Sequence, residues 1–535
     1  MRSVMYVFTA VLLILDASTA LSQQKVSIMT DKGIVVGRQS SAVSFLGIPY
    51  AAPPVGKLRW SAPQPPSAWA EPRDASRIGN VCPQVVLALF AVPGLKPGEV
   101  QGKEDCLYLN VYKPAKARPD SRLPVMVWIH GGAFTVGSGS MYDGSVLAAK
   151  YGLVVVTMNY RLGALGFLAL AGLDSEGKGG RSGNYGLLDQ QAALQWVKTN
   201  IGAFGGNAEN VTIAGESAGG MSVCAQLASP RAAGLFVRAI IQSGLCESPG
   251  NAVTVREAES RNVEYVQKLG CSANDVDCLR RVQPAKLMST KVPGRRPISN
   301  LVWSPVYESG VLPLKLQTAF SQGKFNRVPV LAGTNHDEGR LFVSVVSPNG
   351  KPVTAVQYWG GTGLLVGASN TRKVLLQYPF RTYGTPAVAF ATMFTDGVFS
   401  CPAERIDRAL SKYVPVYAFE FNDAQAATSL KAPADLPGLG SFHGSSQVYA
   451  FQSAIPGIAA PSMFSSAQRR LSDEFSGAWA AFVATGEPRA AGAPSWLTFG
   501  SSRGGVQEFD LTGMKENPGY SMEHKCALWS ALNLK

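Results

Sequence analysis

Histidine and closely paired cysteine are scarce in this chain. Among its 535 residues there is no C-x-x-C pair, and the four histidines are His130, His336, His443 and His524. Of these, only His524 lies near a cysteine, Cys526. Zinc sites are typically built from closely spaced Cys and His ligands, so we expect no metal site. The chain also lacks any run of five or more Lys or Arg residues, which argues against a nucleic-acid partner.

Long apolar segments are missing beyond the N-terminus. No later segment offers the roughly 18 uninterrupted apolar residues that a membrane-spanning helix needs, so we expect a mature chain without stable membrane insertion. Residues 1–20 combine a basic Arg2, an apolar stretch over 4–14 that is too short to span a bilayer comfortably, and a small-residue ending at Ala20. This pattern is typical of a removable signal peptide and predicts a secreted or periplasmic protein.

Charged residues are also few, at 16%, whereas hydrophobic residues make up 46% of the chain. Such a composition is typical of a well-packed globular protein with one large core. We find no internal repeat and no low-complexity linker, and therefore expect a single catalytic domain over residues 24–530. The net charge of +13 indicates either a general attraction to anionic surfaces or steering of anionic substrates.

Short β-branched runs alternate with helical stretches along the chain. The buried strands that we expect lie at residues 125–129, 153–158, 211–214, 328–331 and 414–421. Leu188, Ala192 and Trp196 form one apolar stripe of a helix over 187–201. This alternation predicts an α/β fold with a central, mostly parallel sheet. Residues 247–300 and 340–400 are less sheet-like, and we expect them to insert over the sheet as a lid or gorge wall.

The most informative motif is Gly-Glu-Ser-Ala-Gly at residues 215–219, with Ser217 at its centre. It lies between an expected strand and an expected small-residue helix. A G-x-S-x-G turn in that context forms a nucleophile elbow, which lifts the serine hydroxyl above the sheet. The motif alone also matches plain Gly/Ser turns, and the strand and helix around it favour the catalytic interpretation.

A nucleophilic serine needs a histidine base that is oriented by a carboxylate. His130 opens a Gly-rich loop after a strand, which is either a plain turn or part of an oxyanion hole. His443 lies on a loop after the strand-like 414–421 and suits the base, whereas His336 could be a surface residue and His524 is expected to be structural. The acid should follow the strand at 328–331, where both Asp337 and Glu338 fit.

Several segments together make the sequence similar to the type-B carboxylesterase family. The segments that carry the resemblance are residues 45–51, 104–110, 130–134, 159–161, 183–190 and 215–220. The resemblance covers nearly the whole mature chain. It implies the α/β-hydrolase fold, with long loops and inserted helices that form a gorge.

The resemblance also implies roles for individual residues. It assigns Ser217, Glu338 and His443 to the catalytic triad. It assigns the oxyanion hole to the amides of Gly132, Ala133 and Ala218. Of the eight cysteines, it pairs Cys82 with Cys106, Cys271 with Cys278 and Cys401 with Cys526, and leaves Cys224 and Cys246 free.

Three positions depart from the family pattern. Ser446 stands where the family commonly has an acid three residues after the catalytic histidine. The loop between Cys82 and Cys106 carries Phe90 but no Trp, so the choline-binding cation–π contact of cholinesterases is not expected. Residues 299–303 resemble the family's acyl-pocket stretch with fewer aromatics, which indicates a roomier acyl pocket.

We therefore expect a serine carboxylesterase that acts on small-molecule esters through an acyl-enzyme and without a cofactor. Bulky or anionic esters are the substrate classes that the pocket and the charge favour. Two other hypotheses remain open. One is a non-catalytic cholinesterase-like binding or adhesion protein, and the other is a lipase that acts at an oil–water interface. The oligomeric state is not indicated by the sequence.

Overall fold

The computed structural model describes residues 24–85, 96, 98–174, 182–244, 246–247, 253–292, 301–346, 351–489, 492, 495–501 and 505–532. The expected signal peptide, Phe90 and residues 299–300 of the expected acyl-pocket stretch lie outside the described residues.

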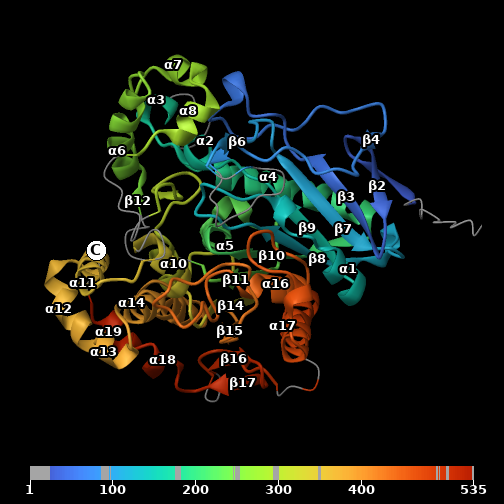
Figure 1. The fold of residues 1–535 in the computed structure, drawn as a ribbon. Helices are drawn as coiled ribbons and strands as arrows, with labels where there is room; N and C mark the ends of the chain where they lie inside the picture. Colours follow the sequence, from blue (N-terminus) through green and yellow to red (C-terminus); the bar gives the residue numbers. More distant parts are fainter. Residues whose placement is uncertain are drawn as a thin grey trace, which may run out of the picture.

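A 13-stranded mixed sheet organises the protein (Figure 1). Its strands, in spatial order, are β1 (Lys25–Thr30), β2 (Gly33–Gln39), β3 (Ala42–Pro49), β7 (Tyr108–Pro114), β9 (Val154–Met158), β8 (Leu123–Ile129), β10 (Gly206–Glu216), β11 (Arg238–Gln242), β14 (Val330–Asn335), β15 (Val416–Phe421), β16 (Val506–Asp510) and β17 (Gly513–Asn517), with β4 (Arg73–Asp74) beside β2. Every neighbouring pair from β9 to β16 is parallel. Two short ladders, β5 (Gln84–Val85) with β6 (Val100–Gln101) and β12 (Val253–Thr254) with β13 (Val306–Tyr307), lie outside this sheet.

Helices cover both faces of the parallel strands. On one face α1 (Ser145–Tyr151) and α17 (Ser466–Thr485) contact each other and the sheet. On the other face lie α4 (Tyr185–Asn200), α5 (Ala218–Ala228), α9 (Leu316–Ser321) and α15 (Cys401–Leu410). Because both faces are covered, β9, β14 and β15 are buried along their whole length. This explains why consecutive residues in these strands are apolar, as in Val154–Val156 and Val416–Phe419, rather than alternating with polar ones.

The five expected strands and the helix over 187–201 all occur, with shifted ends. The largest shift is in β10, which starts at Gly206 rather than at 211. The reason is that residues 207–210 are mostly polar and at least partly exposed, so hydrophobicity does not reveal them. The parallel strands with helices on both faces confirm the predicted α/β fold with a central, mostly parallel sheet.

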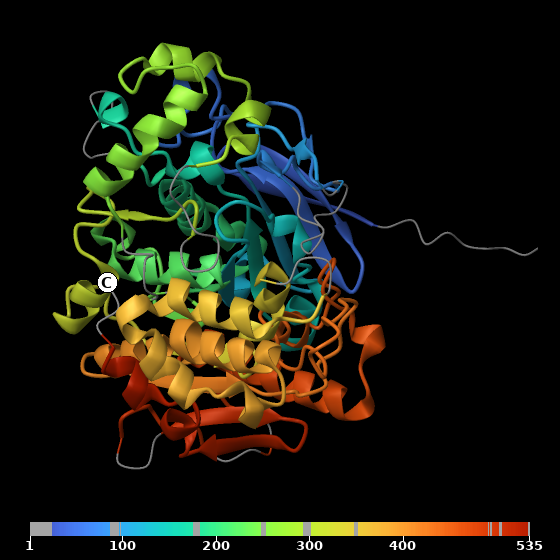
Figure 2. The same cartoon turned by 60° about the vertical axis from the view of Figure 1, so that its left-hand side comes forward.

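The two expected insertions are helical. The first contains α6 (Val255–Lys268), α7 (Val276–Arg281) and α8 (Pro284–Ser289), and the second contains α10 (Gly339–Val346), α11 (Ala355–Val366), α12 (Ala368–Gln377), α13 (Phe380–Tyr383) and α14 (Pro386–Phe394). Figure 1 places both on the side of the molecule away from β2, β3 and β4. Figure 2 shows the yellow and orange helices of the second insertion stacked side by side.

The remaining helices are short. They are α2 (Gly163–Phe167), α3 (Ala171–Asp174), α16 (Ser446–Phe451), α18 (Tyr520–Glu523) and α19 (Cys526–Ser530). Among the described residues, no helix has both the length and the apolar character that crossing a membrane requires.

Four disulfides cross-link the described residues. Three are the expected pairs Cys82–Cys106, Cys271–Cys278 and Cys401–Cys526. The fourth joins Cys224 to Cys246, so the expectation that these two thiols are free is wrong. The physical reason is the sheet topology: α5 follows β10 and packs on the adjacent β11, which brings the Cα atoms of the two cysteines to 6.0 Å. Their spacing in sequence does not reveal this proximity.

The fourth disulfide gives a direct test. We expect denatured, unreduced protein from an oxidising compartment to contain no free thiol, and peptide mapping to recover a fragment that links Cys224 to Cys246. Replacing both by alanine should lower the free energy of unfolding by about 3 kcal/mol, because the bond closes a 22-residue loop in the unfolded chain. Two titratable thiols in the unreduced wild type would contradict the pairing.

Candidate active site

Ser217 occupies the single residue between β10, which ends at Glu216, and α5, which begins at Ala218. Its backbone has φ 58° and ψ −123°, a strained conformation for a residue with a side chain. The turn is possible because a Cβ atom at Gly215 would collide with Gly219, and one at Gly219 would collide with the carbonyl of Ile129. The Ser217 amide donates to the Gln242 carbonyl at 3.0 Å, which holds the turn on β11. Ser217 is therefore fixed at the tip of a sharp elbow, as the motif predicted.

His443 lies directly against the Ser217 hydroxyl. Its Nε2 is 2.8 Å from Ser217 Oγ, and its Nδ1 is 2.6 Å from Glu338 Oε2. With the proton of a neutral imidazole on Nδ1, His443 donates to Glu338 and accepts from Ser217. His443 is 5% exposed and Glu338 is fully buried, while Ser217 is partly exposed. The serine, the base and the carboxylate thus form one hydrogen-bonded chain that solvent reaches only at the serine.

The two candidate acids have separate partners. Glu338 Oε1 accepts from the Asn335 amide at 2.8 Å and from the Ser243 hydroxyl. Asp337 instead pairs with Arg340 at 3.0 Å and accepts from the Ser441 amide at 3.1 Å. The structure therefore places Glu338, and not Asp337, behind His443.

The loop after β8 lies beside the elbow. A Cβ atom at Gly131 would be 3.1 Å from Ser217 Cβ. Gly132 has φ 102° and Ala133 has φ 55°. Among the described residues, the amides of Gly132 and Ala133 donate to no other backbone group, and Ala218, as the first residue of α5, has no acceptor within its helix. All three predicted oxyanion donors thus lie in the two segments that meet at Ser217.

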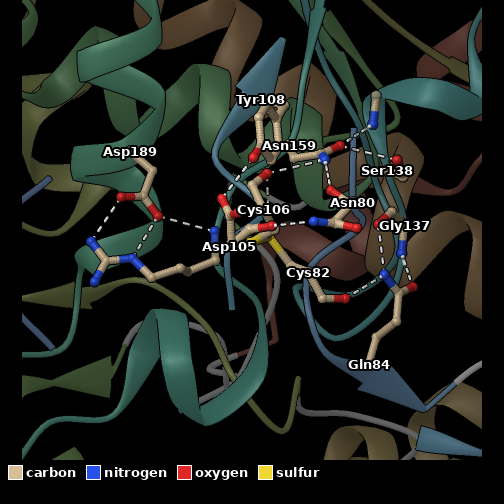
Figure 3. The surroundings of a disulfide bond; sticks show 12 residues. Asn80, Cys82, Gln84, Asp105, Cys106, Tyr108, Gly137, Ser138, Asn159 and Asp189 are labelled. Atoms are coloured by element: carbon tan, nitrogen blue, oxygen red, sulfur yellow. Dashed lines mark hydrogen bonds and ion pairs between the residues drawn. A yellow bond between two sulfur atoms is a disulfide. The ribbon is translucent and has the colours of Figure 1, made fainter. Parts of the chain in front are cut away.

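The Cys82–Cys106 disulfide lies close to the far end of this loop (Figure 3). The Gln84 side chain accepts from the Gly137 amide at 2.8 Å and donates to the carbonyls of Gly137 and Cys82, each at 3.0 Å. Asn159 donates to the Cys106 carbonyl at 3.1 Å and accepts from the amide of Gly139 at 2.9 Å. These contacts fix both sides of the disulfide to residues 137–139 and so brace the loop that carries Gly132 and Ala133.

His130 is not available as a base. It is fully buried, stacks on Tyr160 at 4.4 Å between ring centroids, and directs Nδ1 at the Gly131 carbonyl, 2.8 Å away. Burial lowers the pKa of His130 to about 4, so its imidazole is neutral at ordinary pH. His130 therefore belongs to the loop, as the sequence indicated.

The other two histidines lie apart from the triad. His524 is buried between Asp396, at 2.7 Å, and Glu420, at 2.8 Å, which agrees with the expected structural role. His336 is partly exposed and contacts Glu523 at 3.2 Å. Within the described part of the chain, neither imidazole hydrogen-bonds to Ser217.

Glu216 is a residue of the site whose role was not predicted from the sequence, although it lies within the elbow motif. Its Oε1 is 3.4 Å from His443 Nε2, and this oxygen has no hydrogen-bond partner among the described residues. Burial raises the pKa of Glu216 to about 7. Burial alone would lower the pKa of His443, but the charges of Glu216 and Glu338 outweigh it and raise that pKa to about 9. Glu216 therefore favours the imidazolium form of His443.

This contact predicts a shift in the pH dependence of catalysis. His443 must be neutral to accept a proton, so kcat/KM should rise as pH passes its pKa. Glu216→Gln removes a nearby negative charge and should move this rise to lower pH by about one unit. The measurement is kcat/KM between pH 5 and 10, with Glu209→Gln as a control because Glu209 is exposed and pairs with Lys198. An unchanged profile, or a shift to higher pH, would contradict this role of Glu216.

Neutral side chains replace the usual acidic residue behind the triad. Ser446 is fully buried, donates to Asn335 Oδ1 at 2.6 Å and accepts from the Gln242 side chain. Asn335 in turn donates to the carbonyl of Phe442 at 2.8 Å. In place of an acid at position 446, a neutral hydrogen-bond network therefore links β11 and β14 to the residue before His443.

Two aromatic rings pack beside the His443 imidazole and were not predicted. Phe342 on α10 and Phe399 lie 5.1 and 4.9 Å from it between ring centroids. Phe399 belongs to a π-helical turn, Thr395–Ser400, and such turns are frequent at functional sites. In sequence, both residues look like ordinary core aromatics. Trp303, the last residue of the stretch that resembles the family's acyl pocket, is buried and packs edge-on against Tyr265.

Comparisons with known proteins agree with this geometry. Residues 23–529 match the sequence profile described as the carboxylesterase family. Para-nitrobenzyl esterase from Bacillus subtilis (strain 168) is 37% identical over 477 residues, which cover 86% of this chain and 90% of that protein. Fumonisin B1 esterase from Sphingopyxis macrogoltabida is 35% identical over 520 residues, which cover 93% and 89%. A solved structure of PNB esterase has a TM-score of 0.76 and 34% identity, and the match covers 94% of this chain and 99% of that chain.

Proposed function

The chain belongs to the carboxylesterase family and is a carboxylic ester hydrolase, and from this premise we propose that Ser217, His443 and Glu338 are its catalytic triad. The observation that carries the proposal is the hydrogen-bonded chain from Ser217 Oγ through both nitrogens of His443 to Glu338. The free donors next to Ser217 complete the set of groups that ester hydrolysis requires.

In the first half-reaction, Ser217 Oγ attacks the carbonyl carbon of the ester while His443 Nε2 takes the hydroxyl proton. Glu338 stabilises the imidazolium that forms. The negative charge on the former carbonyl oxygen is held by the amides of Gly132, Ala133 and Ala218. The tetrahedral intermediate then expels the alcohol, which receives its proton from His443, and the acyl group remains on Ser217.

In the second half-reaction, water replaces the alcohol. His443 takes a proton from the water as its oxygen attacks the acyl carbon, and then returns that proton to Ser217 Oγ when the acid leaves. The same imidazole serves both halves. This requires that His443 stays in place while Ser217 carries the acyl group.

The test is hydrolysis of p-nitrophenyl esters from acetate to palmitate, together with covalent labelling by a fluorophosphonate. We expect turnover and one label per chain, on the peptide that contains Ser217. The chain length with the highest kcat/KM measures the acyl pocket. No label on folded protein would favour a non-catalytic binding protein, and activity that appears only on emulsified long-chain esters would favour a lipase.

For the substrate class, we propose bulky or anionic esters. The net charge of +13 supports the anionic class, because a positive surface raises the local concentration of negative substrates. Fumonisin B1 belongs in the substrate panel, since the relative that carries its name aligns over most of both chains. Anionic esters should have a higher kcat/KM than matched neutral esters at low salt, and this difference should shrink at high salt. Equal rates at low salt would exclude steering.

We also propose that the chain is exported, with residues 1–20 as a signal peptide. The four disulfides support this location, because such bonds persist in oxidising compartments. N-terminal sequencing of the secreted or periplasmic protein should find a start soon after Ala20. A mature protein that retains Met1 would contradict the proposal.

A further inference from the structure

A second cluster of ionisable side chains lies near the C-terminal end of the chain. Three of its members are His336, which follows β14, Glu420 on β15, and Glu523 on α18. One ligand atom from each lies within 4.8 Å of the others. These residues are distant in sequence, which is why the spacing of histidines and cysteines gave no sign of them.

Ion pairs connect the cluster to its surroundings: His336 Nε2 lies 3.2 Å from Glu523 Oε1, and His336 Nδ1 lies 3.3 Å from Asp337 Oδ1. His524 Nε2 contacts Glu420 Oε1, and His524 Nδ1 contacts Asp396. Asp337, beside His336, pairs with Arg340. These contacts orient Glu420 and leave its second oxygen uncommitted.

That second oxygen, Glu420 Oε2, is the decisive observation. Glu420 is fully buried, and within the described part of the chain its Oε2 has no hydrogen-bond partner. A buried carboxylate oxygen without a partner is costly unless an ion or a donor completes it. Glu523 is exposed, so one side of the cluster is open to solvent and an ion can enter.

We propose that His336, Glu420 and Glu523 bind a divalent transition cation of the zinc class. An imidazole with two carboxylates suits Zn²⁺ better than Mg²⁺ or Ca²⁺, which prefer oxygen ligands alone. Ligand atoms around a tetrahedral zinc lie about 3.3 to 3.5 Å apart, so a movement of roughly one ångström by the exposed Glu523, which already lies 3.2 Å from His336, closes the set. Water completes the coordination on the open side.

The charges also balance with a bound ion. Asp337, Asp396, Glu420 and Glu523 supply four negative charges, and Arg340 with a protonated His524 supplies two positive ones. A divalent cation bound to a neutral His336 brings the cluster to zero. The ion would tie α18 to the ends of β14 and β15, two residues before Glu338. Its role is thus to brace the segment that carries Glu338.

The experiment is a zinc titration of full-length protein that has been stripped with a chelator. We expect one equivalent of Zn²⁺ to bind, and the midpoint of thermal unfolding to rise by roughly 2 to 4 °C. Both His336→Gln and Glu523→Gln should weaken binding at least about tenfold. Glu516→Gln is the matched control, because Glu516 is exposed on the neighbouring β17 and lies outside the cluster.

Three results would overturn the site. The first is that the wild type binds no zinc, which would mean that a protonated His336 satisfies the carboxylates without an ion. The second is that both variants bind zinc as tightly as the wild type, which would place the ion elsewhere. The third is that one equivalent of zinc abolishes esterase activity in the wild type and in His336→Gln alike, which would place the ion at His443. Ester hydrolysis by Glu523→Gln in the absence of zinc checks that the variant is folded.

Discussion

Substitution of Ser217 by alanine is expected to lower kcat for p-nitrophenyl acetate by about 10⁵-fold. The reason is that Oγ is the group that forms the covalent bond, and no other hydroxyl occupies the position 2.8 Å from His443 Nε2 among the described residues. KM should change little, because a missing hydroxyl leaves the surrounding walls in place. The measurement is steady-state hydrolysis of the purified variant, with an unchanged midpoint of thermal unfolding.

The control for this substitution is Ser321→Ala, an exposed serine at the end of α9. It should retain full activity and should still react with a fluorophosphonate. Residual activity of Ser217→Ala above about 1% would show that another group performs the attack. In that case the proposed triad would be wrong even though the family assignment stands.

The second large effect is expected for Glu338→Gln, which should lower kcat by about 10⁴-fold. The amide keeps the size of the side chain but removes the charge that stabilises the His443 imidazolium. It can also donate to Nδ1 and so favour the tautomer with its proton on Nε2, which cannot accept from Ser217. The test is kcat and KM on one activated ester, with fluorophosphonate labelling slowed in parallel.

Asp337→Asn is the matched control, since the two acids are neighbours and the sequence did not distinguish them. Asp337 contacts Arg340 and the Ser441 amide, so its substitution should lower thermal stability while kcat stays within about tenfold of the wild type. A larger loss of kcat in Asp337→Asn than in Glu338→Gln would exchange the two assignments.

Much of the fold could be predicted from local sequence patterns. The elbow at Ser217 could be predicted because it needs small residues on both sides, and these leave a recognisable motif. The parallel strands could be predicted because burial on both faces produces apolar runs such as residues 154–158. The polar start of β10 could not, because it joins the sheet through the pairing of Gly206 with Leu123, before a register shift, and local hydrophobicity does not reveal that contact.

Contacts between segments that are distant in sequence were harder to predict. The choice of Glu338 over Asp337 depends on the direction in which two adjacent side chains point, which only the folded loop determines. The Cys224–Cys246 bond depends on α5 packing beside β11, and the Glu216 contact depends on where the His443 loop returns. In each case the residue was visible in the sequence, whereas its partner was set by packing across the sheet.

The neutral network behind the triad has a consequence for turnover. Gln242 accepts from the Ser217 amide through its carbonyl and donates to Ser446 through its side chain. In the proposed mechanism, an acylated Ser217 has no hydroxyl to donate to His443, and one of the two hydrogen bonds on the imidazole is lost. The links through Ser446 and Asn335 to the Phe442 carbonyl do not depend on that hydroxyl. These links should keep His443 in place for the incoming water, and we expect the lifetime of the acyl-enzyme to depend on how firmly β11 and β14 hold this loop.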